Sequence, residues 1–556
     1  MKVVTVEEMR RIEAASDTAG HSYAAMMERA GRAVAEAVIA RREVDGRPIL
    51  VLVGPGNNGG DGLVAAHYLA QAGARITCYL FKPRSAAQDE NLRRIQEQGK
   101  RAAILLADED EGLNQLERLA READVVIDAL LGTGVRLPLR GRLADVLDTV
   151  GNVRAARRTP PKKAPTPLIP RRDRAEWNTI PFVVAVDGPS GLEYDTGALD
   201  KAALPADLTV TFAYPKSGHF RFPGAGELGE LVVADIGTDP NLADDVALEV
   251  VTPDMVRGWL PARPLNAHKG TFGRAMVVAG SVNYTGAAYL AGAAAARSGA
   301  GLVTLALPAP IHRPIAARLP EATYLLLPHA LGVIAAGAAS VLGERLSEYD
   351  ALLLGPGLGQ EKETAAFVNA LLSGAKGHKS IGFLQERGGS TPPPTLPPLI
   401  VDADGLNILA QTENWERSLP ASSILTPHPG EMARLMGGSV QEVQSDRVAV
   451  AQSQATAWGQ VIVLKGAHTV VAAPDGRTVI QPFANPGLAT AGSGDVLAGV
   501  IVALRAQGME AFEAAAAGAY VHGLAGEMAR PEGVAGMIAG DILAHLQRAW
   551  KLVTGV

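Results

Sequence analysis

The chain has 556 residues, too many for one ordinary domain, and its composition of 47% hydrophobic and 20% charged residues can bury substantial cores. The net charge of −6 gives no basic footprint for nucleic acid, and no run reaches the about 18 uncharged apolar residues of a membrane helix. A single cysteine, Cys78, and an N-terminus without the apolar core of a signal peptide favour a cytoplasmic location.

The first part of the chain alternates short β-branched strands with helices. A capping box from Thr5 to Glu8 predicts the start of an amphipathic helix. Strands are then expected at 49–53, 76–81, 125–127, 182–186, 209–212 and 231–233, with helices at 62–72, 86–98 and 113–121. This order is typical of a parallel sheet covered on both faces. Residues 1–240 are therefore predicted to form a Rossmann-like α/β/α sandwich.

Prolines between 240 and 264 predict a linker, after which a second α/β domain is expected over 250–556. Its strands are expected at 275–279, 302–307, 351–354, 399–402, 423–426 and 461–464, and its closing helices at 496–506 and 511–528. Two proline-rich segments, 151–179 and 374–398, are expected to be solvent-exposed insertions.

A glycine-rich segment, GPGNNGGDG at 54–62, joins the first expected strand to a helix. Backbone N–H groups at a helix start favour a phosphate, although this motif is neither the G-x-G-x-x-G fingerprint nor a P-loop. Asp128 and Asp187 end two later strands and lead into glycine-containing turns. Because the carboxyl ends of parallel strands line one crevice, Asp61, Asp128 and Asp187 are expected to gather near one site.

The motifs NNGGDG, VIDALLGTGVRLP and VAVDGPSGL, in this order, make the first domain resemble the NAD(P)H-hydrate epimerases of the YjeF N-terminal family. The resemblance implies a K⁺ ion coordinated by Asn58, Asp128 and Ser190, and Asp187 at the reacting nicotinamide end. It also implies two substrate-binding segments, which are Asn57, Asn58, Gly59, Gly60 and Asp61, and Gly132, Thr133, Gly134, Val135, Arg136, Leu137 and Pro138.

Asp187 is the candidate acid/base of this domain. Epimerising a hydroxylated carbon beside a nitrogen requires a proton to move at that oxygen, and a carboxylate at a partly desolvated strand end can have its pKa moved toward neutrality. One departure from the family is Gly188, where an apolar residue is usual.

The strongest motif of the second domain is NPGLATAGSGDVLAG at 485–499. Gly492 to Gly494 would present backbone N–H groups at the start of an apolar helix, with Asp495 in its first turn, which favours an anion hole. The motif resembles that of the ribokinase-like superfamily, whose G-x-G-D holds the transferring phosphoryl group.

Further strand-end segments, GPGLG, VDADGLN, TPHPGEM and KGAHT, make the second domain resemble ADP/ATP-dependent NAD(P)H-hydrate dehydratases. The resemblance implies that Mg²⁺ and ADP or ATP activate the C6 hydroxyl by phosphorylation, with Asp495 catalytic, so that phosphate leaves and the ring regains its double bond. Implied substrate contacts are Ala287 or its neighbour Ala288, Gly359, His428, Pro429, Gly430, Glu431, Met432, Ala433, Arg434 and Asp495. Implied nucleotide contacts are Lys465, Gly466, Ala467, His468, Thr469, Asn485, Gly487, Thr490, Ala491, Gly492, Ser493 and Gly494.

Two alternatives stay open. The second domain could be a small-molecule kinase of the thiazole or hydroxymethylpyrimidine type, because G-x-G-D serves phosphoryl transfer equally well. The first could be a nucleotide-binding module without catalysis. Expected partners are small molecules, namely hydrated NADH or NADPH and ADP or ATP, for a homo-oligomer that binds neither nucleic acid nor membrane.

Overall fold

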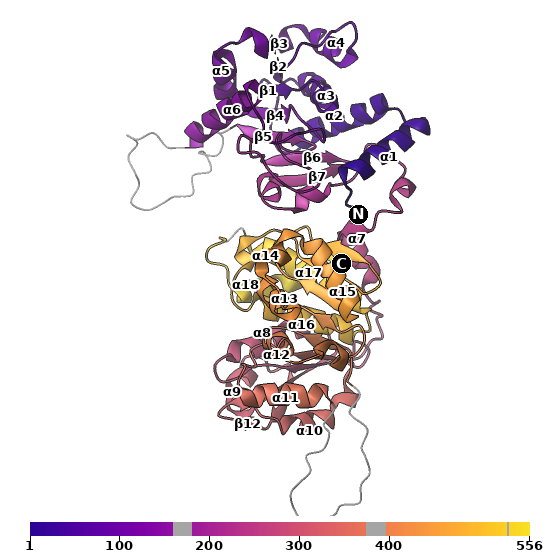
Figure 1. Cartoon of the computed structure of the whole chain (residues 1–556), viewed down its shortest axis with the longest axis vertical. Coiled ribbons are helices and arrows are strands. Elements are labelled where there is room, and N and C mark those ends of the chain that lie inside the picture. The colour runs from indigo at the N-terminus through magenta and orange to yellow at the C-terminus, as the bar shows by residue number, and fades with distance from the viewer. Residues whose placement is uncertain (159–180, 374–395, 531–532, 556) are drawn as a thin grey trace, which may run out of the picture. The chain divides into compact units, whose positions relative to one another are not determined.

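The computed structural model of the chain describes residues 1–158, 181–373, 396–530 and 533–555, and it forms two compact units (Figure 1). One unit consists of residues 2–246, and the other consists of residues 247–556 together with Met1. Most of both expected insertions lies outside the described residues. However, residues 151–158 form the end of helix α6 (Arg142–Arg158), where Val153 is buried, so the expectation of an insertion is wrong for these residues.

The first unit is built on seven parallel strands in the order β3-β2-β1-β4-β5-β6-β7. The strands are β1 (Pro48–Val53), β2 (Arg75–Leu80), β3 (Ala102–Leu106), β4 (Val125–Ala129), β5 (Phe182–Val186), β6 (Leu208–Phe212) and β7 (Glu230–Ala234). The predicted parallel sheet is confirmed. Edge strand β3 was not predicted because it is half-exposed and lacks a continuous buried run.

Helices cover both faces of this sheet. One face packs against α2 (Tyr23–Ile39), α3 (Asn57–Gln71) and α4 (Glu90–Gln96), and the other against α5 (Asn114–Glu122) and α6. Helix α1 (Val6–Thr18) starts at the predicted capping box. The order of the strands reverses between β1 and β4, and in such sheets this position forms a ligand crevice.

The glycine-rich segment after β1 is part of helix α3, which begins at Asn57 and not at residue 62 as expected. Close packing overrides the poor helix propensity of the sequence NNGG. A methyl carbon placed on Gly59 would lie 2.1 Å from Gly54 O, and one on Gly60 would lie 2.6 Å from the sulfur of Met27. Only glycine fits at these contacts, so the helix start can approach both β1 and α2.

The second unit is built on a ten-stranded sheet in the order β11-β10-β9-β14-β15-β16-β17-β18-β19-β8. All neighbours are parallel except the pairs β17–β18 and β18–β19. The strands are β8 (Leu248–Val250), β9 (Arg274–Val278), β10 (Leu302–Pro308), β11 (Thr323–Leu327), β14 (Ala351–Leu354), β15 (Leu399–Val401), β16 (Ile424–Leu425), β17 (Val461–Leu464), β18 (Val470–Ala472) and β19 (Thr478–Ile480); β12 (His329–Ala330) and β13 (Val333–Ile334) form a separate hairpin.

The expected linker at 240–264 is largely folded. It contains β8, which pairs with β19, and α7 (Pro253–Trp259), so the second unit begins within this segment. The short strands β18 and β19 escaped prediction because three buried residues give no readable periodicity.

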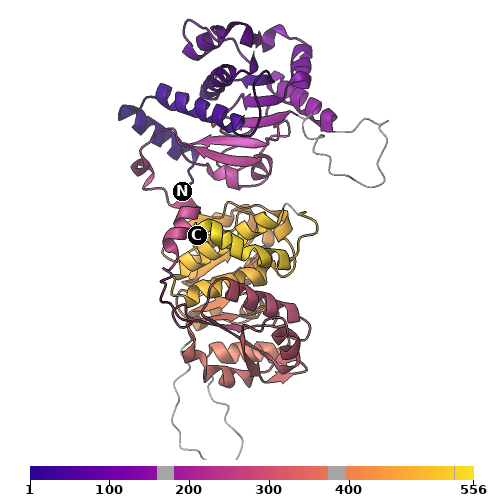
Figure 2. The same cartoon turned by 180° about the vertical axis from the view of Figure 1, so that it is seen from behind.

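One face of the second sheet carries α8 (Thr285–Arg297), α9 (Ala309–Ala316), α16 (Ser493–Ala506), α17 (Ala511–Ala529) and α18 (Ala539–Thr554). The other carries α10 (Ala338–Gly343), α11 (Lys362–Leu372), α12 (Asp404–Leu409), α13 (Pro429–Met436), α14 (Val440–Ser445) and α15 (Arg447–Trp458). The C-terminal helices α16, α17 and α18 pack against one another (Figures 1 and 2). Gly499 of α16 allows close approach to α8, because a methyl carbon there would lie 2.2 Å from Ala291 O.

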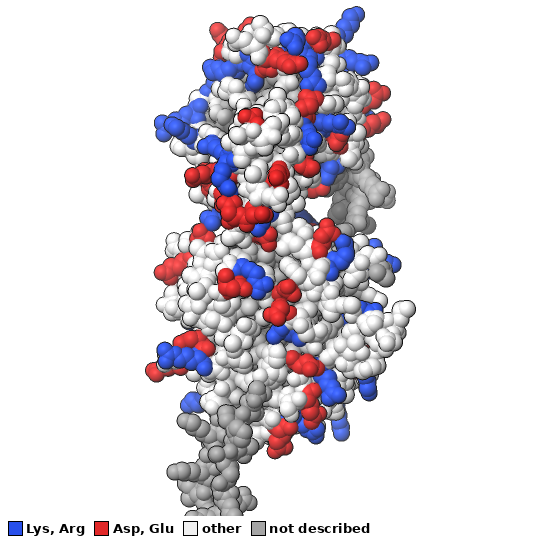
Figure 3. Space-filling view, turned by 90° about the vertical axis from the view of Figure 1, so that its right-hand side faces the viewer, with Lys and Arg blue, Asp and Glu red and all other residues white. Residues whose placement is uncertain are grey.

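Acidic and basic side chains are interspersed over the face of the molecule drawn in Figure 3. In the described part of the chain, no helix is long and apolar enough to cross a bilayer.

Candidate active sites

The first candidate site lies at the carboxyl ends of the central strands of the first unit, where Asp187 follows β5. Asp187 has a φ of +65°, a left-handed conformation that is uncommon for residues other than glycine. Its Oδ1 accepts hydrogen bonds from Thr211 Oγ1 at 2.7 Å and from Lys216 Nζ at 2.6 Å. A strained backbone held in place by such contacts is typical of a functional position.

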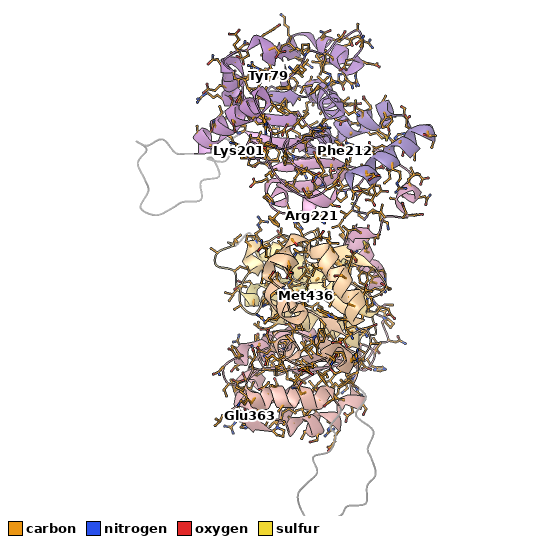
Figure 4. All side chains as sticks on the ribbon, viewed as in Figure 1. Tyr79, Lys201, Phe212, Arg221, Glu363 and Met436 are labelled. Atoms are coloured by element: carbon orange, nitrogen blue, oxygen red, sulfur yellow. The ribbon has the colours of Figure 1, made fainter. Side chains whose placement is uncertain are left out.

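Lys216, the ion-pair partner of Asp187, was missed in the sequence. Strand β6 ends at Phe212, labelled in Figure 4, and Lys216 follows in the next turn. Its side chain is 2% exposed, and Nζ also donates to Thr211 Oγ1 at 2.9 Å. The rule that selected Asp187, a polar residue after a buried parallel strand, would also have selected Lys216.

The electrostatic surroundings keep Asp187 ionised. Burial alone would raise the pKa of Asp187, but the charge of Lys216 and the hydrogen bonds from Lys216 and Thr211 outweigh burial and hold the pKa below its usual value. Burial and the nearby Lys216 charge lower the pKa of His219 to about 4, so this imidazole is neutral near pH 7. Asp187 is therefore ionised near neutral pH, and its pKa does not move toward neutrality as we expected from the sequence.

The residues expected to bind K⁺ come together between β1 and β4. Asp128 is fully buried and accepts hydrogen bonds from Ser190 Oγ at 2.6 Å and from Ser190 N at 2.8 Å. Ser190 Oγ accepts from Leu131 N at 2.9 Å, and Asn58 Nδ2 donates to Leu131 O at 2.9 Å. Burial raises the pKa of Asp128, although hydrogen bonds from Ser190 and Leu130 oppose that rise.

This donor set fits a hard monovalent cation. It offers carboxylate, hydroxyl and amide oxygens, and among the described residues Asp128 has no basic partner to balance its buried charge. No group of three His, Cys, Asp or Glu side chains in the described chain has the arrangement of a metal site. A cation here would therefore rely on the mixed oxygen set.

The two segments expected to hold the substrate of the first unit also meet. The start of α3 faces the turn after β4, since a methyl carbon on Gly132 would lie 3.4 Å from the Asn58 side chain. Arg84 Nη1 donates to Gly54 O at 2.7 Å and so fixes the turn that precedes α3. Residues 132–138 follow β4 and are partly or fully exposed, which leaves them available to a ligand.

Gly188, the departure from the family motif, contacts a buried tyrosine. A methyl carbon on Gly188 would lie 2.8 Å from the hydroxyl oxygen of Tyr194. Tyr194 is 1% exposed, and its hydroxyl has no hydrogen-bond partner among the described residues. The absence of a side chain at 188 therefore makes room for the Tyr194 ring directly beside Asp187.

The second candidate site lies at the start of α16, in the second unit. Gly492 caps this helix with a φ of +88°, and Asp495 stands in the first turn, as predicted. A methyl carbon on Gly494 would lie 3.4 Å from Lys465 Nζ and 3.9 Å from Asp402 Oδ2. The helix start, the lysine after β17 and the aspartate after β15 therefore face one another.

Asp402, which was quoted within a motif but given no role, is central to this cluster. Its Oδ1 accepts from Lys465 Nζ at 2.7 Å and from Thr426 Oγ1 at 2.7 Å, and Glu431 Oε2 lies 3.7 Å from Lys465 Nζ. Burial, with the charge of Asp402 next in size, raises the pKa of Asp495 to about 7, although Lys465 opposes the rise. Asp495 can thus exchange a proton near neutral pH.

The residues expected to contact the hydrated dinucleotide border this cluster. His428 caps α13, and its backbone N–H donates to Glu431 Oε2 at 2.8 Å. Gly359 N donates to Asp404 Oδ2 at 2.9 Å, which ties the turn after β14 to α12. Ala288 is fully buried, whereas Ala287 is half-buried beside Gly357.

The expected nucleotide contacts divide into exposed backbone and buried side chains. Gly466 and Ala467 are exposed beside Lys465. In contrast, His468 is buried with Nδ1 3.2 Å from Gln481 O, and the Asn485 side chain donates to Gly526 O at 3.0 Å. Side chains of these last two residues therefore support the loops from within.

Together, the two doubly wound sheets and their strand-end carboxylate sites define a two-domain α/β enzyme that handles nucleotides. Residues 23–218 match the family described as YjeF-related protein N-terminus, and residues 275–548 match the family described as NAD(P)H-hydrate dehydratase.

Full-length relatives carry both domains. A protein of Moorella thermoacetica named bifunctional NAD(P)H-hydrate repair enzyme Nnr is 38% identical over 98% of this chain and 96% of its own length. The protein of the same name from Escherichia coli is 33% identical over 98% of this chain and 92% of its own length. The chain belongs to the family of bifunctional NAD(P)H-hydrate repair enzymes.

A solved structure resembles the second unit. The ADP/ATP-dependent NAD(P)H-hydrate dehydratase of Bacillus subtilis, co-crystallised with ATP/Mg²⁺, is 32% identical; it covers 55% of this chain and 98% of its own, with a TM-score of 0.45. The family models and the full-length relatives confirm the expected family, and the two helix-covered sheets confirm the expected two-domain α/β fold class.

Proposed function

We propose that the chain repairs hydrated NADH and NADPH in two steps. The first unit interconverts the R and S hydrates, and the second unit uses ADP or ATP to remove water from the S hydrate. The observation that carries the proposal is the cluster at the start of α16, where Asp495 stands in the first turn of the helix beside Lys465 and Asp402. Family membership favours this reaction over a vitamin-precursor kinase.

In the second unit, the amides of Gly492 to Gly494 hold the nucleotide phosphoryl group that is to be transferred. Asp495 accepts the proton of the C6 hydroxyl as that oxygen attacks phosphorus, which its pKa of about 7 permits near neutral pH. Phosphate is a far better leaving group than hydroxide, so the C6–O bond breaks with phosphate taking its electron pair, and loss of a proton from C5 leaves the C5–H electron pair as the restored ring double bond.

Mg²⁺ accompanies the nucleotide in this proposal and neutralises phosphate charge when bound. Carboxylate oxygens are its preferred ligands. Asp402 offers one, because its Oδ1 takes both hydrogen bonds from Thr426 and Lys465 while Oδ2 faces Gly494. Gly466 and Ala467 contribute exposed backbone at the nucleotide, and the substrate lies against Ala287, Gly359 and the start of α13.

In the first unit, Asp187 is the base, and Lys216 holds it ionised and in place. The dinucleotide phosphates lie at the start of α3, where Asn57 to Asp61 face residues 132–138. Asn58, Asp128 and Ser190 would hold K⁺ through their oxygen atoms, and the ion would balance the charge of the buried Asp128 carboxylate beside the turn after β4. We also expect a homo-oligomer, which sedimentation would test.

An absorbance assay tests the proposal. The protein is mixed with hydrated NADH, Mg²⁺ and either ADP or ATP, and return of the reduced-nicotinamide band is followed while chromatography separates the hydrates. Both hydrates should be consumed. Asp495→Asn should abolish dehydration but not epimerisation, and Asp187→Asn should leave the R hydrate to its uncatalysed rate.

Matched controls are Asp148→Asn in the first unit and Asp475→Asn in the second, both at exposed aspartates. They should leave both activities unchanged. Formation of ADP from ATP with a thiazole or hydroxymethylpyrimidine substrate, without recovery of NADH, would instead establish the kinase alternative.

A further inference from the structure

Asp61 is a buried carboxyl that the fold leaves without a partner. It lies in α3 with an exposed fraction of 9%, and its carboxyl makes no hydrogen bond or ion pair with the described residues. A buried polar group without a partner is costly, so such a group calls for an explanation. An interaction with a ligand atom would supply one.

The charged groups that act on Asp61 are Asp187, Glu13 and Lys216. Asp187 follows β5, Lys216 follows β6, and Glu13 reaches the site from α1. Lys216 is already committed, because its Nζ contacts Asp187 Oδ1 at 2.6 Å. The positive charge of Lys216 is therefore already paired with Asp187. Asp61 faces a site with two further carboxyl groups.

These surroundings separate the two aspartates. Burial, and then the negative charges of Asp187 and Glu13, raise the pKa of Asp61 well above its usual value. The pKa of Asp187 moves the other way, because Lys216 and Thr211 outweigh burial. Two carboxyls of one site whose pKa values are shifted in opposite directions are the arrangement expected of an acid and a base acting on one substrate.

We propose that Asp61 is the general acid of the epimerase site and works opposite Asp187, the base. The inference rests on the proposed epimerase function and deepens it. Among the described residues, Asp61 is the carboxyl of the site that is both buried in the helix that receives the dinucleotide and without a hydrogen-bond or ion-pair partner. It therefore contacts the reacting nicotinamide, whereas Lys216 and Thr211 position Asp187.

The proposed step opens and recloses the hydrated ring. Asp187 accepts the proton of the C6 hydroxyl, the O–H electron pair becomes the second bond of a C6 carbonyl, and the C6–N1 bond breaks. Its electron pair stays on N1, which takes the proton of Asp61. After rotation about the C5–C6 bond, N1 attacks the other carbonyl face, Asp61 regains its proton, and Asp187 returns its proton to the oxygen. Every atom and proton is restored, and only the configuration at C6 changes.

The test measures interconversion of the purified R and S hydrates by the full-length chain without nucleotide. Asp61→Asn keeps the side-chain shape but removes the acid, so kcat should fall about 100-fold or more while KM stays near its wild-type value. The basic limb of the wild-type kcat–pH profile, which reports loss of the Asp61 proton, should be absent from whatever activity remains.

Glu13→Gln provides a second variant that leaves Asp61 itself intact. Without the Glu13 charge, the pKa of Asp61 should fall, so the basic limb should move to lower pH. Hydrogen exchange of the first unit should match wild type for both variants, since neither residue is expected to anchor the fold.

The outcomes distinguish failure of the proposed epimerase function from failure of the role proposed for Asp61. If wild type does not interconvert the hydrates, the proposed function fails. If wild type does so and Asp61→Asn keeps its kcat with only a raised KM, Asp61 binds substrate without donating a proton and the inference is overturned. A basic limb that Glu13→Gln leaves in place would overturn it as well.

Discussion

Replacing Lys216 by methionine should both destabilise the first unit and disable its base. Lys216 is 2% exposed and its partner Asp187 10% exposed, so the substitution strands a carboxylate in the interior with the Thr211 hydroxyl as its remaining close donor. Breaking a buried ion pair at one end typically costs about 3–5 kcal/mol. Removing both charges with Lys216→Met/Asp187→Asn should cost clearly less, because no unpaired charge stays buried.

The loss of unfolding free energy caused by Lys216→Met should depend on pH in a definite direction. In wild type the lowered pKa of Asp187 contributes stability above its unfolded-state pKa, and that contribution is lost as the pH falls through the folded-state value. In Lys216→Met, burial should raise the pKa of Asp187 instead, so the variant is penalised at neutral pH and relieved in acid. The difference in unfolding free energy between wild type and Lys216→Met should therefore become smaller as the pH is lowered.

This difference in unfolding free energy is measured by urea denaturation, with unfolding monitored by hydrogen exchange of peptides from β5 and β6. In a Trp177→Phe background, tryptophan fluorescence serves as an internal reference, since the other four tryptophans, Trp259, Trp415, Trp458 and Trp550, all lie in the second unit. Lys201→Met, at the exposed lysine labelled in Figure 4, is the matched control. The reasoning would be refuted if Lys216→Met lost less than about 1 kcal/mol of unfolding free energy, or if the double variant were no more stable than Lys216→Met.

Three further predictions concern both units. Asp402→Asn removes a negative charge, so it should lower the pKa of Asp495 from about 7 and move the acid limb of the dehydratase kcat/KM profile to lower pH. If this limb does not move, Asp495 is not the titrating base. Gly188→Ala should displace the Tyr194 ring and reduce epimerase kcat, and a second substitution, Tyr194→Leu, should restore part of it. Gly499→Ala should cost the second unit about 1–3 kcal/mol in urea, read by tryptophan fluorescence, with no effect on hydrogen exchange of the first unit.

Periodic apolar runs were enough to predict the central strands of both sheets, because those strands are buried on both faces. Strand β3 lies half-exposed at an edge, and β18 and β19 have three residues each, so their patterns were too weak to predict. Strand-end motifs likewise led to Asp187 and Asp495, whose neighbours along the chain are distinctive.

The partners of those aspartates were harder to predict. Lys216 lies in an ordinary-looking turn, and Glu13 stands on a surface-patterned helix, so only the fold brings them to Asp187. Asp402 was visible in its motif, but its pairing with Lys465 depends on the order of strands β15, β16 and β17. Sequence patterns reveal which residues end strands, whereas charge balance within a site depends on which strand ends become neighbours.

Helix α16 places the proposed catalytic Asp495 on one of the most enclosed elements of its unit, with Val496 to Leu504 packed on every side and Gly499 in contact with α8. Such a helix cannot swing aside to admit a ligand or release a product. Ligand entry and product release must therefore take place around a stationary carboxylate. Substitutions in this helix would affect both folding and catalysis, so few of them should be tolerated during evolution.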